Sequence, residues 1–215
     1  MRLVIKIGGS LAFDANGPRL AYLRRVGEVV AVLKKEHQLI VAVGGGQFIR
    51  KYLRNVKGKL PNRQIEWIFI ELLRANVRLL SFMFGLKPIF DLNEVTKKTT
   101  GVVGGIRPGR STDANAAVCA EKIKADLFIK LTNVEGIFTK DPKKYKSARL
   151  IKKLSFGELG KIAEKKTAPA QYGILDPLAL AVINRKKIKT VVMSGRNPKH
   201  LFDVLQGTPH GTVIG

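Results

Sequence analysis

The residues best suited to chemistry lie in four short segments that follow runs of aliphatic and β-branched residues. These segments are rich in Gly, Ser, Thr, Asn and Asp, and they cover residues 8–10, 44–46, 104–113 and 132–141. Glycine lets a backbone approach a phosphate with no Cβ in the way, and a helix that begins after such a loop directs free N–H groups at the anion. One glycine loop is often only a turn, but four that open on one edge of a sheet predict a phosphate-binding site.

Two charged residues in or near these segments have the types that phosphoryl transfer requires. Lys6 ends an otherwise apolar run close to Gly8, where its ammonium could bridge the phosphates of a donor or simply be solvated. Asp113 shares the third segment with Arg107 and Arg110, and its carboxylate could cap a helix, orient a lysine or join a Mg²⁺ shell. Both fit this chemistry, because its catalysis is mostly positioning and electrostatics.

The sequence does not contain the residue patterns of several other nucleotide-binding, hydrolytic and metal sites. The chain has no Walker-type phosphate loop, no Gly-x-Gly-x-x-Gly turn and none of the protein-kinase motifs. Its three histidines are far apart in the sequence, and its single cysteine excludes an intrachain disulfide. No zinc spacing is present, and no serine has a histidine nearby in the sequence to act as its base. Neither hydrolase chemistry nor a metal site made of protein side chains is therefore expected.

The elements that must position these segments follow from hydrophobic periodicity. Strands are predicted at 3–7, 39–43, 87–91, 102–103, 127–131, 189–193 and 212–214. Helices are predicted at 19–36, after Gln47, and at 66–83, 111–122 and 178–185. Strands that alternate with helices indicate an α/β fold with a mostly parallel sheet, in which ligands lie at the carboxyl ends of the strands.

Composition bounds the remaining possibilities. The chain has 215 residues, of which 45% are hydrophobic, and one domain is expected. No stretch reaches the roughly 18 apolar residues of a membrane helix, and the single Cys119 favours a reducing, cytoplasmic location. The net charge of +23 attracts phosphates and polyanions. Because the basic residues are dispersed without an aromatic-interleaved stripe, a generally lysine-rich surface is preferred over nucleic-acid binding as the explanation.

The combination of motifs resembles the amino acid kinase superfamily. This resemblance is carried by residues 6–10, 43–46, 111–117 and 130–142. Within the superfamily the chain is similar to archaeal-type uridylate kinases, through residues 74–76, 104–113, 174–179 and 211–214. The resemblance implies a three-layer α/β/α sandwich with a mostly parallel central sheet, formed by one domain over residues 1–215.

The same resemblance implies ATP-dependent phosphorylation of UMP to UDP with Mg²⁺, in pyrimidine nucleotide biosynthesis. The N-terminal half would hold mainly UMP and the C-terminal half mainly ATP. The family commonly forms hexamers, so a homo-oligomer is expected, whereas a membrane partner is not. On the long helix, an apolar stripe could serve either an interface or the core, and its residues are Trp67, Ile70, Leu73 and Val77.

By similarity, individual residues acquire expected roles. The expected catalytic residues are Lys6, Asp113 and Asp176. The expected ATP-binding residues are Lys6, Ile7, Gly8, Gly9, Ser10, Gly46, Arg50, Thr132, Phe138 and Asp141. The expected UMP-binding residues are Gly45, Glu66, Ile106, Arg107, Pro108, Gly109, Arg110, Ser111 and Thr112.

Several residues depart from the family pattern. Glu66 stands where an aspartate is expected, and Phe69 stands where a small residue is expected. Ile106 and two arginines replace Thr and His types in the third segment, and Phe138 replaces a tyrosine. The acceptor therefore stays open between UMP and another small phosphate or carboxylate. A basic nucleic-acid-binding protein on this scaffold is the alternative outside enzymes.

Overall fold

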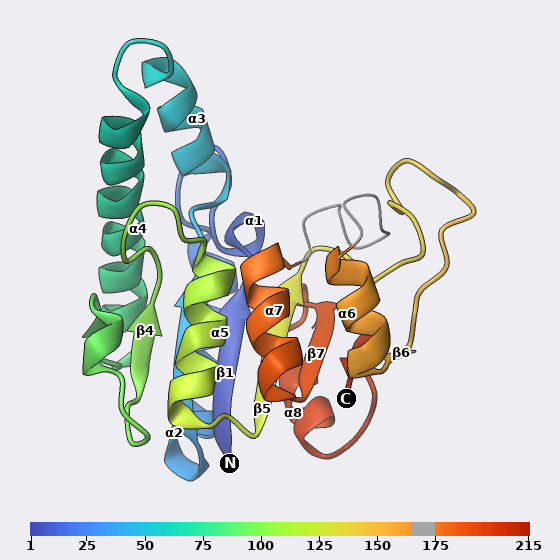
Figure 1. The fold of residues 1–215 in the computed structure, drawn as a ribbon. Coiled ribbons are helices and arrows are strands. Elements are labelled where there is room, and N and C mark those ends of the chain that lie inside the picture. Colours follow the sequence, from blue (N-terminus) through green and yellow to red (C-terminus); the bar gives the residue numbers. More distant parts are fainter. Residues whose placement is uncertain (165–174) are drawn as a thin grey trace.

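The strands join into one continuous sheet with the predicted, mostly parallel arrangement. The computed structural model describes residues 1–164 and 175–215, and in this part of the chain eight strands follow the order β3-β4-β2-β1-β5-β7-β8-β6 (Figure 1). They are β1 (Arg2–Ile7), β2 (Gln38–Val43), β3 (Pro88–Ile89), β4 (Gly101–Val103), β5 (Leu127–Thr132), β6 (Lys153–Leu154), β7 (Thr190–Ser194) and β8 (Thr212–Ile214). Neighbouring strands are parallel except for β7 and β8, which are antiparallel.

Helices cover both faces of this sheet. They are α1 (Gly9–Ala12), α2 (Leu20–Glu36), α3 (Gly46–Val56), α4 (Asn62–Phe84), the 3-10 turn η1 (Leu92–Glu94), α5 (Thr112–Ile123), α6 (Phe156–Glu164), α7 (Pro177–Lys186) and α8 (His200–Leu205). In Figure 1, α5, α6 and α7 lie over one face, whereas α2 and α8 lie behind the other. These three layers confirm the predicted α/β/α sandwich. None of the helices in the described ranges has the length and hydrophobicity needed to cross a membrane.

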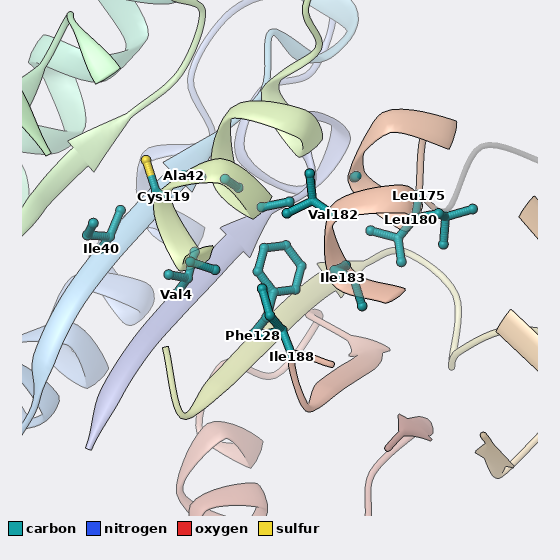
Figure 2. Packing of buried hydrophobic residues seen from close by; sticks show 14 of the residues in the cluster. Val4, Ile40, Ala42, Cys119, Phe128, Leu175, Leu180, Val182, Ile183 and Ile188 are labelled. Carbon is teal, nitrogen blue, oxygen red and sulfur yellow. The ribbon is translucent and has the colours of Figure 1, made fainter. Parts of the chain in front are cut away.

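Side-chain alternation along the central strands builds a hydrophobic core on each face. On β1, Leu3 and Ile5 belong to the cluster that contains the buried side of α2. Val4 points the other way and shares a cluster with Phe128 and Val182, between the sheet, α5 and α7 (Figure 2). Apolar residues on both sides of a strand are typical of a parallel sheet that is covered on both faces.

Two lysines interrupt the apolar alternation on the α5 face. Lys6 on β1 and Lys130 on β5 are paired in register, each two residues beyond the apolar pair Val4 and Phe128. Because side chains repeat every two residues along a strand, both lysines point toward the layer that contains α5. Only 5% of Lys6 and 4% of Lys130 are exposed. The register therefore places two buried cations side by side, near the edge of the sheet where the glycine loops open.

A hairpin of two helices, α3 and α4, extends past this edge of the sheet (Figure 1). The second half of α4 packs behind the sheet through residues such as Val77. Its first half packs on α3, where Ile70 and Leu73 meet Ile49. Three residues of the apolar stripe on α4 are therefore buried within the chain itself, and Trp67 is the stripe residue that stays exposed, at 44%.

The other differences from the predicted elements concern short or polar segments. The sequence analysis does not predict β6 or α8, which are too short to show a clear hydrophobic period, and it also misses the nine-residue α6. Helix α4 begins at Asn62 and not at Glu66, since its first turn is polar and lies beyond the sheet. Residue 174, in the motif 174–179, lies outside the described residues.

The first two glycine loops touch each other backbone to backbone. A Cβ at Gly9 would lie 2.3 Å from the Gly46 nitrogen, and a Cβ at Gly46 would lie 2.6 Å from the carbonyl oxygens of Gly9 and Phe13. Gly46 also has a φ of 68°, in the left-handed region that glycine adopts readily. Glycine is therefore required for the loops after β1 and β2 to come together.

Gly46→Ala is expected to destabilise the chain more than Gly58→Ala. Gly58 has a φ of 78° but nothing within 4 Å of a new Cβ, so alanine there adds only backbone strain of about 1–2 kcal/mol. At Gly46 the collision with backbone atoms adds to this strain, for a total of about 3–4 kcal/mol. Chemical denaturation measures both variants, and equal losses would show that the two loops separate freely.

Candidate active site

A cavity of about 370 Å³ opens at the carboxyl ends of β1, β2 and β5, and we call it the glycine-loop cavity. Its lining residues are Lys6, Gly8, Gly9, Ser10, Gly44, Gly45, Gly46, Arg50, Thr112, Asp113, Lys130, Thr132, Asn133, Val134, Asp141, Pro142 and Lys143. All four segments singled out in the sequence contribute to this lining. The structure thus brings the predicted loops together at one edge of the sheet.

One carboxylate in the wall of this cavity holds two ammonium groups. The Oδ1 atom of Asp113 lies 2.9 Å from Nζ of Lys6. The same oxygen accepts a hydrogen bond from Nζ of Lys130. Only 14% of the Asp113 side chain is exposed. When both lysines are protonated, two cations and one anion leave a net positive charge, which suits the phosphates of a nucleotide.

The charges of this cluster set its protonation. Burial by itself would raise the pKa of Asp113, but the ammonium groups of Lys6 and Lys130 outweigh it and hold that pKa below its usual value. Burial lowers the pKa of Lys130 to about 7, and the positive charge of Lys6 acts in the same direction, against Asp113. The carboxylate is therefore ionised at neutral pH, whereas Lys130 titrates near neutrality and would hold its proton more firmly beside an anion.

The start of α5 fixes the position of Asp113. Ser111 is the N-cap of this helix, since its hydroxyl accepts a hydrogen bond of 2.9 Å from the Ala114 amide. The alternative in which Asp113 caps the helix is therefore wrong: Asp113 lies in the first turn and pairs with the lysines. Ser111 also donates to Asp176, which caps α7 by accepting from the Ala179 amide at 2.8 Å. Asp176 thus joins the starts of two helices and does not line the cavity.

The loop after β5 closes another side of the cavity. Thr132 ends the strand, and Asn133, Asp141 and Lys143 continue the lining. The Asp141 carboxylate accepts a hydrogen bond of 3.0 Å from the Lys143 amide, which stabilises a turn. Arg196 donates to the Asn133 carbonyl oxygen at 3.3 Å and connects this loop to the end of β7. These two hydrogen bonds hold the loop in its turn and against the end of β7.

Some of the predicted site residues lie outside the glycine-loop cavity. Ile7 is buried in the core on the α2 side, and Ile106 is buried in the core on the α5 side. Phe138 forms an isolated β-bridge with Leu150 and is not part of the lining. Of the predicted UMP-binding residues in the third segment, those that line neither this cavity nor its larger neighbour are Ile106, Arg107, Pro108, Gly109, Arg110 and Ser111.

A larger cavity of about 810 Å³ lies between α3 and the start of α4, and we call it the α3–α4 cavity. Its lining residues are Ala15, Gln47, Arg50, Leu53, Arg54, Lys57, Asn62, Ile65 and Glu66. Arg50 lines both cavities, so they adjoin at this side chain. Of the residues expected on the acceptor side, Glu66 lies in this cavity, whereas Gly45 and Thr112 line the glycine-loop cavity.

Lys130 is the central residue that the sequence analysis does not single out. It carries the same signal as Lys6: a lysine within an otherwise apolar strand, followed closely by a polar loop. Comparison of the runs 3–7 and 127–131 position by position would have found it. What the sequence does not show is that the two strands are neighbours in the sheet.

The cavity offers oxygen atoms but no metal cage. In residues 1–164 and 175–215, no group of three or more His, Cys, Asp or Glu side chains is arranged to hold a metal ion. Asp113 and Asp141 are the carboxylates of the glycine-loop cavity, and the hydroxyl groups of Ser10, Thr112 and Thr132 belong to residues of its lining. This donor set fits a Mg²⁺ ion that arrives on phosphates and keeps much of its water.

The fold and the cavity together define a class of protein: an α/β sandwich with a cationic, glycine-lined cavity of the kind that suits phosphates, at the carboxyl ends of its strands. Comparison of the sequence with protein families agrees with this class. The Amino acid kinase family model matches residues 1–100 and 88–194. The chain belongs to the amino acid kinase family.

Individual relatives are similar over the whole chain. A uridylate kinase of Thermococcus kodakarensis is 34% identical over 224 residues, which cover 100% of this chain and 99% of that protein. The crystal structure of uridylate kinase from Archaeoglobus fulgidus has a TM-score of 0.86 at 32% identity and covers 100% of both chains. The crystal structure of UMP kinase from Bacillus anthracis has a TM-score of 0.81 at 18% identity, covers 100% of this chain and 95% of its own, and shows the fold alone.

Asp113→Asn is expected to lower the free energy of unfolding by about 3 kcal/mol, because it leaves two buried lysines without a counter-charge. Adding Lys130→Met removes one of these lysines and should recover part of the loss. Asp126→Asn serves as the control, since it breaks an ion pair with Arg2 in which both side chains are 37% exposed, and it should cost less than about 1 kcal/mol. Denaturant titration at pH 7 measures all three variants. Equal losses at positions 113 and 126 would contradict the role of the buried cluster.

Proposed function

We propose that the chain is a uridylate kinase, which transfers the γ-phosphate of ATP to UMP and forms UDP. The observation that carries the proposal is the cluster of Lys6, Asp113 and Lys130 in the wall of a glycine-lined cavity. Full-length similarity to archaeal uridylate kinases supports these substrates over those of other family members. The reaction would serve pyrimidine nucleotide biosynthesis.

In this proposal the glycine-loop cavity binds the phosphates of ATP. Backbone amides of the loops after β1 and β2 donate to the phosphate oxygens, and the close contact of Gly9 with Gly46 brings these loops together. Lys6 and Lys130 hold the oxygens of the transferred phosphate and stabilise the charge that moves to the leaving group. The loop from Thr132 to Asp141 binds the nucleoside part.

The acceptor needs no general base. A UMP phosphate oxygen is already deprotonated at neutral pH, so it attacks the γ-phosphorus in line and the ADP oxygen leaves with the electron pair of the broken bond. Asp113 stays ionised because its pKa is held low by the lysines. Its role is therefore to orient and space the two ammonium groups, and not to accept the proton of a nucleophile.

The proposal includes a Mg²⁺ ion that binds together with the phosphates of ATP. The residues of the cavity fit such an ion, because Asp113, Asp141 and the hydroxyl groups of the lining can complete a shell begun by the donor. When bound, Mg²⁺ neutralises phosphate charge and helps to align the donor. The protein residues contribute the orientation of the donor and the remaining positive charge.

The α3–α4 cavity is the proposed acceptor site, with Arg50 at the junction where two phosphate groups would meet. Glu66 could accept hydrogen bonds from ribose hydroxyl groups. The ring of Phe69 approaches Gly45 closely, since a Cβ at Gly45 would lie 3.3 Å from its Cε2 atom. The family pattern has a small residue at position 69, so the ring of Phe69 leaves less room beside Gly45 than that pattern does. For this reason a different small phosphate is the second candidate acceptor.

The proposal extends to organisation and assembly. Residues 1–215 would act as one domain, with the acceptor side mainly in the N-terminal half and the ATP side mainly in the C-terminal half. A cytoplasmic homo-oligomer, a hexamer by family resemblance, is the expected form. The exposed Trp67 on the α3–α4 hairpin is a candidate for a contact between copies.

A coupled assay of ADP release tests the function directly. The chain is incubated with ATP, Mg²⁺ and, in turn, UMP, CMP, AMP or GMP, and Lys6→Ala is measured beside the wild type. A rate with UMP that exceeds the others by at least about 100-fold, and that falls by about 100-fold or more in Lys6→Ala, is the expected result. Lys189→Ala removes a lysine far from this cavity and is the control.

The outcomes separate the candidates. Selectivity for another nucleotide, or a rate only with a different small phosphate, would reject UMP and keep the kinase. A folded protein that binds no ATP would reject the kinase function itself.

The pH dependence tests Lys130. The protonated lysine is the form that binds phosphate, and its pKa is about 7 in the free protein. The kcat/KM for ATP should therefore fall as the pH rises through about 7, and kcat should fall only at higher pH, since bound phosphates keep the proton on the lysine. In Lys130→Arg the fall near pH 7 should disappear, because arginine stays charged. A fall that persists in this variant would assign it to another group.

A further inference from the structure

One segment between β5 and β6 concentrates positive charge on the surface. We call residues 137–151 the basic hairpin. Its cations are Lys140, Lys143, Lys144, Lys146 and Arg149, and its one acidic residue is Asp141. Two more lysines, at 152 and 153, follow directly. In Figure 1 it is the yellow to gold loop that projects from the side of the molecule.

The basic hairpin is folded and not an unstructured tail. Its two arms are joined by hydrogen bonds from the Thr139 amide to the Arg149 carbonyl oxygen at 2.9 Å and from the Ile151 amide to the Ile137 carbonyl oxygen at 2.8 Å. Its tip turns on Asp141, whose carbonyl oxygen accepts from the Tyr145 amide at 2.9 Å. The cations are therefore held on a defined surface.

The charges of these cations are not neutralised by carboxylates of the described residues. All five are exposed, and in residues 1–164 and 175–215 none of them forms an ion pair with a carboxylate. Many exposed cations elsewhere in the described residues are also without an ion pair, although Arg185 and Lys186 both pair with Glu121, so the distinguishing feature of the hairpin is the number of cations that it gathers on one ordered loop. Unpaired positive charge on an ordered loop is free to bind a polyanion.

An aromatic ring lies among the cations. Tyr145 is 53% exposed, and Nζ of Lys140 lies 5.7 Å from the centroid of its ring. The ring is too exposed to serve the core, and its neighbours in the sequence are Lys144 and Lys146. Aromatic rings among basic residues stack with unpaired bases, whereas the bases of a duplex and the repeat units of polyphosphate present no such face.

We propose that the basic hairpin binds single-stranded nucleic acid without sequence preference, through phosphate contacts of its cations and stacking on Tyr145. This interaction is additional to the proposed kinase function and does not depend on it. The lysine-rich composition of the whole chain predicts only diffuse attraction for polyanions, and the hairpin, with Tyr145 between Lys144 and Lys146, is a local exception to the dispersed pattern of basic residues expected from the sequence. The hairpin predicts a localised site with a contribution from the bases.

Fluorescence anisotropy of a labelled 20-nucleotide oligouridylate with the full chain tests the proposal. The first variant neutralises three hairpin cations that do not line the glycine-loop cavity: Lys144→Gln, Lys146→Gln and Arg149→Gln. The matched control removes three exposed cations elsewhere, by Arg24→Gln, Lys35→Gln and Lys98→Gln. The hairpin variant should weaken binding at least about tenfold and lower the slope of log affinity against log salt by about 2, whereas the control should change both much less.

A second pair of variants tests the ring. Tyr145→Ala should weaken binding by about fivefold or more, and Tyr145→Phe should keep the affinity of the wild type. Unlabelled polyphosphate and a duplex of equal length are the competitors, and both should displace the single strand poorly.

Three results would overturn the proposal: equal loss in the hairpin and control variants, no effect of Tyr145→Ala, or competition by polyphosphate or duplex as strong as that by the single strand.

Discussion

The structure depends on one buried carboxylate, Asp113, which neutralises charge between lysines from two different strands. Two ammonium groups so close together and so far from water would repel each other strongly without it. The arrangement needs β1 and β5 in the register that pairs Lys6 with Lys130. It also needs α5 to start at the end of the sheet, held there by the core in Figure 2. With both lysines protonated, the cluster keeps a net positive charge, which is the physical basis of the proposed phosphate site.

Much of the arrangement of strands and helices around the cluster can be predicted from the sequence. The central strands are apolar on both faces, and the helices between them have a clear period, so the layers and the site at the carboxyl ends could be predicted. Lys6 stands out because it interrupts such a strand. Lys130 interrupts its strand in the same way, but its importance depends on a neighbour 124 residues away in the chain. Pairing between distant strands is a tertiary property, and local periodicity does not contain it.

The acceptor side is less predictable for a related reason. The start of α4 extends past the sheet, so its residues have no buried face that would impose a period on the sequence. The third segment also divides in a way that composition does not show: Ile106 turns into the core, Ser111 caps α5, and Asp113 alone of these three reaches the lysines. Family resemblance assigns all residues of such a segment to the same ligand. The structure instead gives neighbouring residues of the segment different roles.

The positive charge of the chain acts in two adjoining places, inside the glycine-loop cavity and on the surface around its mouth. Inside the cavity, burial lowers the pKa of Lys130 to about 7 and the charge of Lys6 acts in the same direction, so an anion bound beside this lysine favours its protonated form. Because a deprotonated lysine must regain its proton first, an anion is expected to bind less tightly as the pH rises through about 7. Outside, the net charge of +23 raises the local concentration of anions around the cavity mouth, where Lys143 lies. The tip of the basic hairpin, at Asp141 and Lys143, also lines that cavity, so a field that attracts a nucleotide also attracts longer anions.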